Sequence, residues 1–404
     1  MTIGLVLSGG GARGAYEVGV LKYVREKLAR EVPVRFDVLC GTSVGAINAC
    51  YLAATATEPA AGVRVLSDVW ETMRFEDVVR FDLKQLVHLP KLFLSNLPFL
   101  HDRRDRLGGL LNTLPLERLV VDRLHWPGIS AGLASGAFKA LSVTTTDVLT
   151  GLTTIFIQSR DGVMPKWSSD LHTLARATVI KSEHALASAA IPILFPAVQV
   201  EGRFYCDGGV RQNTPLSPAL RLGANKILVV GLRHVPTEVP NAEPGTLERF
   251  PGVPFIAGKV LNALLLDHLD YDIGRLKRFN ALLEGGRTVY GPDFESKVNA
   301  VLEPMRRAAY RHVDVEVVRP SVDLGKIAAD HARYGPFAKY GKSLIARYLR
   351  HSAVADNAVD ADLLSYLLFD SAYCRDLIDL GFRDAEAQAD SIAALFTTPS
   401  PSED

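Results

Sequence analysis

Cysteine is scarce in this sequence, and an excess of charge of either sign is missing. The 404 residues include four cysteines, and no two of them form a CxxC pair. That spacing argues against a zinc site and a dense disulfide framework, and it is typical of free thiols in a reducing compartment. Lysine plus arginine equal aspartate plus glutamate at 45 each, so no long-range field favours nucleic acid as a partner.

Segments that would carry the chain across a membrane are also missing. No stretch approaches the ~18 uninterrupted apolar residues of a transmembrane helix. The chain starts on a strand-like run, residues 3–7, instead of the basic and apolar regions of a signal peptide. We therefore expect a cytoplasmic protein, and peripheral contact with a membrane is compatible with this sequence. Because the net charge is zero, such contact must be local and largely apolar.

The first half of the chain alternates β-branched runs with helical patterns, which is typical of a mostly parallel α/β sheet. Residues 3–7 and 36–41 have the apolar pattern of buried strands, and residues 15–30 have helical apolar spacing. Residues 44–55 are almost wholly apolar and predict a helix buried on most sides. Further expected elements are strands at 139–148, 152–158 and 225–232, a helix near 182–190 and a hairpin at 198–209.

Two stretches break this alternation and suggest the domain organisation. Residues 75–127 are rich in Leu and Phe and contain prolines, which predicts a helical insertion and a candidate lid. A loop rich in Pro and Glu at 235–254 marks a boundary. We expect an α/β domain at 1–235, a mainly helical C-terminal extension at 236–398 with one added strand near 312–319, and a disordered tail at 399–404.

The second predicted strand runs into GTSVG at residues 41–45, and a helix follows. In that context G-x-S-x-G indicates a nucleophile elbow, in which a sharp turn exposes Ser43 while Gly41 and Gly45 let neighbouring backbone approach. The N-terminus of the following helix favours negative charge on Ser43. The motif alone is a weak signal, and the strand before it and the helix after it strengthen it.

The glycine-rich run GGGARG at residues 9–14 follows the first strand and supports two hypotheses. As G-x-G-x-x-G it matches a dinucleotide-binding turn, which requires an acidic residue at the end of the second strand. Asp37 lies near the right distance, but it begins that strand, and the strand ends in GTSVG. Alternatively, the amides of Gly10 and Gly11 stabilise the oxyanion formed when Ser43 attacks a carbonyl. The placement of GTSVG favours acyl chemistry.

A base for Ser43 is harder to identify from the residues. None of the ten histidines stands in a convincing motif, and most lie inside or beside predicted helices and strands. The conspicuous acid is Asp207, which ends a strand and is followed by Gly208 and Gly209. Asp-Gly is also a common turn former. Asp207 is therefore a candidate base only because Ser43 and GGGARG are also present.

Together, GGGARG, GTSVG and DGG resemble the pattern of the patatin-like phospholipase family: a glycine-rich loop with an embedded arginine, then GxSxG, then Asp-Gly-Gly or Asp-Gly-Ala. The stretches 187–224 and 144–156 also look like family members. The resemblance covers about residues 3–235, and no matched position departs from the pattern. It implies a three-layer α/β/α fold with a mostly parallel sheet, of patatin type. From about residue 255 the likeness is loose.

The resemblance implies a serine lipid acyl hydrolase, of phospholipase A or esterase type, that needs no histidine. Ser43 would be the nucleophile and Asp207 the base of a Ser–Asp dyad, with Gly9, Gly10 and Gly11 in the oxyanion hole. Arg13 would orient that loop. The alternatives are a non-catalytic lipid-binding or scaffold protein on the same fold and, less favoured, an NAD(P)-binding oxidoreductase. A weakly basic exposed aspartate would not suffice, so Asp207 must be shielded beside Ser43.

A lipid or acyl-ester substrate needs an apolar surface beside the nucleophile. The candidates for a wall or a lid are residues 86–100 and, second, 258–269, although ordinary core or inter-domain packing is the favoured explanation of both. The mixed-charge cluster at 101–106 is a candidate for contact with lipid phosphates, or a solvated face. No metal-binding constellation and no cofactor motif beyond GGGARG is present, so we expect activity without cofactors or metal ions.

Overall fold

The computed structural model describes residues 1–78, 109, 111–162, 171–235, 269–306, 310–334 and 361–397. The candidate lid at 86–100, the cluster at 101–106, nearly all of the segment 258–269 and the tail lie outside the described residues. None of the helices in the described ranges combines the length and hydropathy that crossing a lipid bilayer requires.

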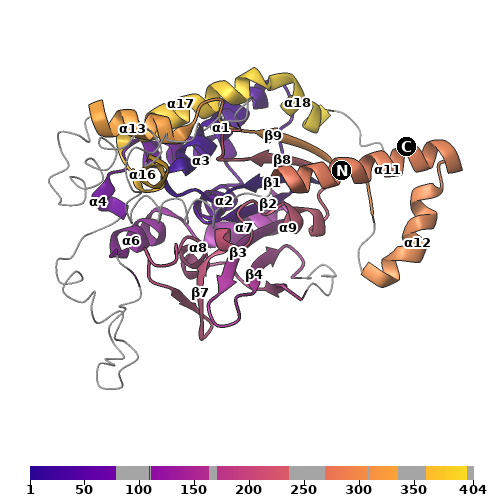
Figure 1. Ribbon diagram of the computed structural model, residues 1–404, viewed down its shortest axis with the longest axis horizontal. Coiled ribbons are helices and arrows are strands. Elements are labelled where there is room, and N and C mark those ends of the chain that lie inside the picture. The colour runs from indigo at the N-terminus through magenta and orange to yellow at the C-terminus, as the bar shows by residue number, and fades with distance from the viewer. Residues whose placement is uncertain are drawn as a thin grey trace, which may run out of the picture.

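A nine-stranded sheet lies at the centre of the described structure (Figure 1). Its main path has the order β5-β4-β3-β2-β1-β8-β9, while β7 pairs with β3 and β6 pairs with β7. The strands are β1 (Ile3–Leu7), β2 (Val38–Thr42), β3 (Ala140–Asp147), β4 (Thr153–Ser159), β5 (Thr173–Ala177), β6 (Val198–Val200), β7 (Arg203–Asp207), β8 (Lys226–Val230) and β9 (Asp314–Val318).

The strands β3, β2, β1, β8 and β9 are parallel, so their carboxyl ends meet at one edge of the sheet. Their central members read as continuous apolar runs because both faces are covered, as in other buried parallel sheets. The strands β4 and β7 run antiparallel to β3. Since β7 enters from beyond the shared edge, its last residue, Asp207, lies opposite Thr145 near the carboxyl end of β3.

Helices and short 3-10 turns connect these strands, and further helices follow the last one. They are η1 (Gly11–Arg13), α1 (Gly14–Glu26), η2 (Leu28–Arg30), α2 (Val44–Ala54), α3 (Pro59–Glu71), α4 (Phe75–Val78), α6 (Leu114–Arg123), α7 (Pro127–Ser135), α8 (Ser182–Ser188), η4 (Gly208–Val210), α9 (Leu216–Arg221), α11 (Leu269–Tyr290), α12 (Phe294–Arg306), α13 (Leu324–Tyr334), α16 (Ala361–Leu367), α17 (Ser371–Ala387) and α18 (Ala389–Thr397).

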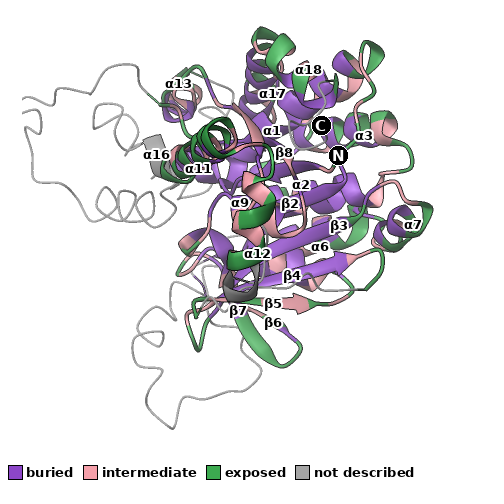
Figure 2. Cartoon of the chain, turned by 90° about the vertical axis from the view of Figure 1, so that its right-hand side faces the viewer, coloured by how far each residue is buried: buried purple, intermediate pink, exposed green. Residues whose placement is uncertain are grey.

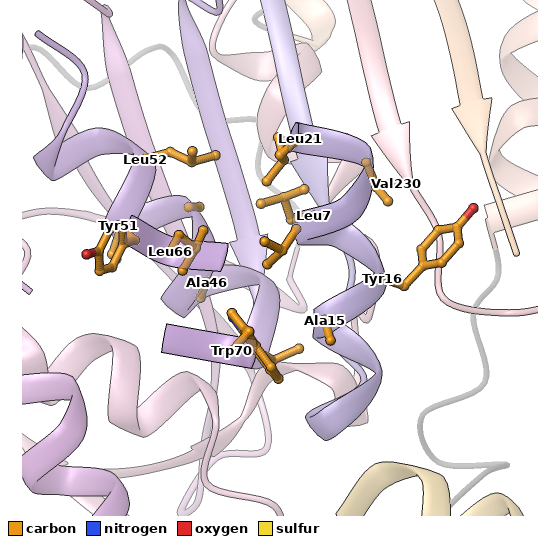
Figure 3. Close-up of a cluster of buried hydrophobic side chains, with 14 of the residues drawn as sticks. Leu7, Ala15, Tyr16, Leu21, Ala46, Tyr51, Leu52, Leu66, Trp70 and Val230 are labelled. Atoms are coloured by element: carbon orange, nitrogen blue, oxygen red, sulfur yellow. The ribbon is translucent and has the colours of Figure 1, made fainter. Parts of the chain in front are cut away.

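Two apolar clusters cover the two faces of the sheet. Successive strand residues point to opposite faces, so Leu5 and Leu7 join the larger cluster while Val6, between them, joins the smaller one. The larger cluster includes α1, α2, α3 and α17, and the smaller one includes α9 and the start of α11. Figure 2 shows the inner strands β2, β3 and β4 as almost entirely buried, while the edge strand β5 is partly exposed. Figure 3 shows side chains from β1, β8, α1, α2 and α3 meeting in the larger cluster.

The C-terminal residues pack onto the same sheet and helices as the N-terminal ones. Strand β9 pairs in parallel with β8, and α17 packs along α1. The two helices approach closely at two glycines: a Cβ on Gly19 would lie 2.0 Å from the carbonyl oxygen of Ile378, and one on Gly381 would lie 2.2 Å from that of Tyr16. The phenol of Tyr16 also donates a 2.9 Å hydrogen bond to Asp384.

The structure confirms the predicted fold class, a mostly parallel sheet with helices on both faces and a helical C-terminal region. The half-exposed run at 312–320 forms the edge strand β9, as its alternation predicts. The opposite edge strand, β5, is not predicted from the sequence. Its sequence TLARA has little β-branched character and is only partly buried, so neither propensity nor periodicity marks it.

Candidate active site

Ser43 lies at a sharp turn between β2 and α2, at the carboxyl edge of the sheet. Its backbone has φ 54° and ψ −127°. Residues other than glycine rarely adopt this conformation, which is typical of a nucleophile elbow. The flanking glycines make this turn sterically feasible. A Cβ on Gly41 would lie 2.3 Å from the carbonyl oxygen of Gly45, and one on Gly45 would lie 2.5 Å from that of Leu7.

The structure brings Asp207 against Ser43, although 164 residues separate them in the chain. The Ser43 hydroxyl donates a 2.6 Å hydrogen bond to Oδ2 of Asp207, and the amide of Gly209 donates a 2.7 Å bond to Oδ1. The next residue, Gly208, packs against the backbone of β3, since a Cβ there would lie 2.3 Å from the carbonyl oxygen of Thr144. The Asp-Gly-Gly turn therefore holds both carboxyl oxygens in fixed positions.

Burial sets the electrostatics of this pair. Asp207 is fully buried and Ser43 is 2% exposed. Loss of water raises the pKa of Asp207 to about 7, although the hydrogen bonds from Ser43 and Gly209 act in the opposite direction. Near neutral pH the carboxylate is therefore a stronger base than that of an exposed aspartate. The arrangement can take a proton from the Ser43 hydroxyl and return it.

The glycine-rich loop lies next to Ser43 at the same edge. A Cβ on Gly9 would lie 3.0 Å from Cβ of Ser43. The amide of Gly9 donates a 3.1 Å bond to the carbonyl oxygen of Asn213, so it is already used. Gly10 and Gly11 stand at the start of η1, where backbone amides have no acceptor within the helix. Two amides are thus suited to receive an anion.

Two side chains that fix this geometry were not identified from the sequence. Ser188 accepts a 2.8 Å bond from the amide of Ser43 and donates a 2.6 Å bond to the carbonyl oxygen of Thr144, so it ties the elbow to β3. Asn213 donates a 3.1 Å bond to the carbonyl oxygen of Gly9. Both lie within the stretch 187–224, but their residue types alone carry no signal for these contacts.

A buried polar chain links the three helices beneath the loops. Asn48 of α2 donates a 2.8 Å bond to Glu17 of α1 and accepts a 3.2 Å bond from the indole of Trp70 of α3. Burial raises the pKa of Glu17 well above its usual value, while the bond from Asn48 opposes that shift. These hydrogen bonds fix the start of α1 relative to the start of α2. The glycine-rich loop leads into α1 and the elbow leads into α2.

An apolar pocket opens from Ser43. Residues of α2, α3, α6, α16 and the segment 189–195 line it, and Arg123 is the only charged residue among the described ones that do so. Its walls include Trp70, Phe195 and Phe369. The part of the predicted insertion that the structure describes contributes through Val78 of α4 and through α6. A pocket of this character suits an extended hydrocarbon chain.

The dinucleotide hypothesis for GGGARG finds no support in the geometry. Asp37 lies at the amino end of β2, where its carboxylate accepts a 2.9 Å bond from the amide of Ile3 and pairs with Arg35 and Lys139. It therefore lies at the edge opposite the glycine-rich loop. Among the described residues, no histidine is hydrogen-bonded to Ser43 or Asp207; the buried His184 instead accepts a bond from the amide of Lys181.

This chain is similar to known phospholipases. A family model described as Patatin-like phospholipase matches residues 5–220. A cGAMP-activated phospholipase of Pseudomonas aeruginosa (strain BWHPSA011 / Pa011) is 28% identical over 212 residues, which are 52% of this chain and 53% of that protein. A cUMP-AMP-activated phospholipase of Escherichia coli is 49% identical over 49 residues, 12% of this chain and 15% of that protein.

The chain therefore spans about half the length of the first of these relatives. Among solved structures, VipD from Legionella pneumophila aligns with 97% of this chain and 74% of its own at 14% identity, with a TM-score of 0.31 that is too low to carry an argument. The family model, by contrast, covers more than half of the chain. On that evidence, this chain belongs to the patatin-like phospholipase family.

Proposed function

We propose that this chain hydrolyses acyl esters of phospholipids or related lipids through an acyl-enzyme on Ser43. The observation that carries the proposal is the 2.6 Å hydrogen bond between Ser43 and the fully buried Asp207, at the end of an apolar pocket. Family membership supports a lipid substrate. Peripheral contact with a membrane stays a prediction of the sequence.

In the first half of the reaction, Oγ of Ser43 attacks the acyl carbonyl while Asp207 takes its proton. The amides of Gly10 and Gly11 receive the negative charge on the carbonyl oxygen, an interaction that typically lowers such a barrier by about 3 kcal/mol per donor. Asp207 then returns the proton to the departing alkoxide of the alcohol. The acyl chain stays on Ser43, with its hydrocarbon part in the apolar pocket.

In the second half, water attacks the acyl-enzyme. Asp207 takes a proton from that water, and the same two amides again stabilise the oxyanion. The proton returns to Oγ of Ser43 as the bond to the acyl group breaks, which releases the fatty acid. Arg13, in the same 3-10 turn as Gly11, is proposed to orient the amides. Gly9 is proposed to act differently from Gly10 and Gly11. It permits the loop to approach Ser43 closely, and its amide donates a hydrogen bond to the carbonyl oxygen of Asn213.

Covalent labelling and hydrolysis test this function together. Wild-type protein is expected to react with a fluorophosphonate probe and to release fatty acid from phosphatidylcholine–phosphatidylglycerol vesicles, whereas Ser43→Ala should do neither. Ser67→Ala is the matched control, since Ser67 is a buried serine that bonds Glu71. Mass spectrometry locates the label and the released acids. Wild-type protein that behaves like Ser43→Ala in both assays would rule out the proposal.

The pH dependence follows from the carboxyl group of Asp207. Only its ionised form can take a proton from Ser43, and burial raises its pKa to about 7. We therefore expect kcat/KM for a soluble acyl ester to rise with pH and to reach half of its plateau near that value, because kcat/KM reports groups of the free enzyme. Steady-state rates across the neutral range provide the check. A profile that stays flat down to about pH 5 would contradict the assignment of Asp207 as the base.

A further inference from the structure

Helix α16 lies directly against the glycine-rich loop, although it comes from far beyond the segment that the family model matches. Its residue Ser365 is fully buried and accepts a 2.8 Å bond from Nε of Arg13. The guanidinium group of Arg13 also lies over the ring of the next residue, Tyr366. The distance from Cζ of Arg13 to the ring centroid is 4.2 Å. Two consecutive residues of α16 therefore hold one side chain of the loop.

The backbone of the loop also rests on α16. Gly11 has φ 57°, and a Cβ there would lie 2.2 Å from the carbonyl oxygen of Tyr366. Glycine is thus required by both its conformation and the contact. Helix α16 is in turn fixed to the rest of the molecule, since it packs on α13 and leads within a few residues into α17, which begins with Asp370 as its N-cap.

Charge explains why Arg13 is sensitive to these two partners. Arg13 is only 6% exposed. Because a buried charge is costly without partners, losing a hydrogen bond or contact of this guanidinium group would lower the stability of the folded protein. The group is planar, with donors in a fixed fork. A hydrogen bond at Nε together with an aromatic ring on one face therefore constrains the orientation of this group, which belongs to the last residue of η1.

The same helix also reaches the pocket beside Ser43. Tyr366, and Phe369 just after the helix, line its wall. Helix α16 consequently touches both the loop that carries the amides of Gly10 and Gly11 and the space that would hold an acyl chain. No other element of the described C-terminal region lines this pocket.

We propose that Ser365 and Tyr366 are positioning residues for acyl transfer: acting through Arg13, they hold the amides of Gly10 and Gly11 in the orientation that receives the oxyanion. The inference rests on the proposed function, and it extends the active site beyond residues 5–220. A misplacement of about 1 Å in such a site lowers rates by about 100-fold. The contribution of α16 should accordingly appear in kcat.

The first test compares variants on a short-chain soluble ester, for which the pocket wall matters little. Tyr366→Leu is expected to lower kcat by about 10- to 100-fold and to change KM by less than about threefold, because the lost contact acts on the transition state. Ser365→Ala should lower kcat by about 10-fold. Tyr366→Phe keeps an aromatic face under Arg13 and should restore kcat to within about threefold of wild type. Ser67→Ala controls for loss of a buried serine.

The second test asks whether the effects run through Arg13. If they do, Arg13→Ala combined with Tyr366→Leu should be no slower than Arg13→Ala alone, since residues that act as a unit are not additive. A purely structural role would instead give effects that multiply. Ser365→Ala removes a single oxygen and provides the same comparison if Tyr366→Leu unfolds, which thermal melting of each variant reveals.

The outcomes separate this inference from the proposed function. If wild-type protein neither hydrolyses the ester nor reacts with the fluorophosphonate, the proposed function fails. If wild-type protein is active but kcat is retained in folded Tyr366→Leu and Ser365→Ala, or their effects multiply with that of Arg13→Ala, the positioning role is overturned and the function stands. Loss of kcat with rescue by Tyr366→Phe and without additivity supports the inference.

Discussion

Replacing Asp207 with asparagine is expected to lower kcat by about 10⁴-fold, because the amide cannot take a proton from Ser43. The same variant should be more stable than wild type at neutral and higher pH. Asparagine has nearly the shape of aspartate and still accepts the bond from the amide of Gly209. It carries no carboxyl group that must be ionised in a fully buried site. Activity and stability should thus change in opposite directions.

The sign of the stability effect follows from linkage. Burial raises the pKa of Asp207 from an ordinary value of 3.8 to about 7, so between these values the folded protein retains a proton that the unfolded chain releases. Stability from this group is full below the lower value, declines through that window and is lowest above about pH 7. The advantage of Asp207→Asn should therefore grow across the window and reach about 1–3 kcal/mol above it.

Denaturant unfolding at about pH 5 and about pH 8 measures this difference. Ser43→Ala is the matched control, since it should be equally inactive but keeps the carboxyl group and loses the donor of the 2.6 Å bond. It should gain no stability at the higher pH. An Asp207→Asn protein that is less stable than wild type at about pH 8, or that keeps more than about 1% of kcat, would contradict the proposed role of Asp207.

Adding one methyl group between α1 and α17 is expected to destabilise the whole protein by about 2–4 kcal/mol. Gly19→Ala would place a carbon 2.0 Å from the carbonyl oxygen of Ile378, and Gly381→Ala would place one 2.2 Å from that of Tyr16. Both clashes are with backbone, so no side chain can move aside and the helices must separate. Separation would also disturb the buried bond between Tyr16 and Asp384.

Gly285→Ala provides the matched control, because Gly285 lies in α11 with nothing within 4 Å of an added Cβ. Alanine is the better helix former at such a site, so this variant should be about 0.5–1 kcal/mol more stable. Thermal or denaturant unfolding of the three variants provides the comparison. If Gly19→Ala unfolds like wild type, then α17 does not pack tightly on α1 in solution, and the contact of α16 with the glycine-rich loop loses its support.

Local patterns in the sequence identify much of this fold. The continuous apolar runs at 3–7 and 227–230 form buried strands because both faces of the sheet are covered. Edge strand β5 escapes detection, since its residues TLARA are only partly buried and owe their conformation to pairing with β4. The helical partners α16 and α17 carry no motif, so their contacts with η1 and α1 could not be anticipated.

The candidate site divides in the same way. Ser43, Asp207 and the glycines of the first loop are marked by short motifs, because a sharp turn or a close backbone approach requires glycine at fixed spacing. Ser188, Asn213 and Asn48 are ordinary polar residues whose importance lies in what they bond. A serine or asparagine at such a position looks like any other until its partner is known.

By itself, the amino-acid sequence determined the class of fold, the family pattern and the residues of a candidate nucleophile, base and anion-binding loop, since backbone sterics and hydrophobic periodicity are local properties. Only the tertiary structure decided that Asp207 is fully buried against Ser43, that the amide of Gly9 is already occupied, and that Ser365 and Tyr366 hold Arg13. These depend on contacts between segments hundreds of residues apart, and on the loss of water that such contacts cause.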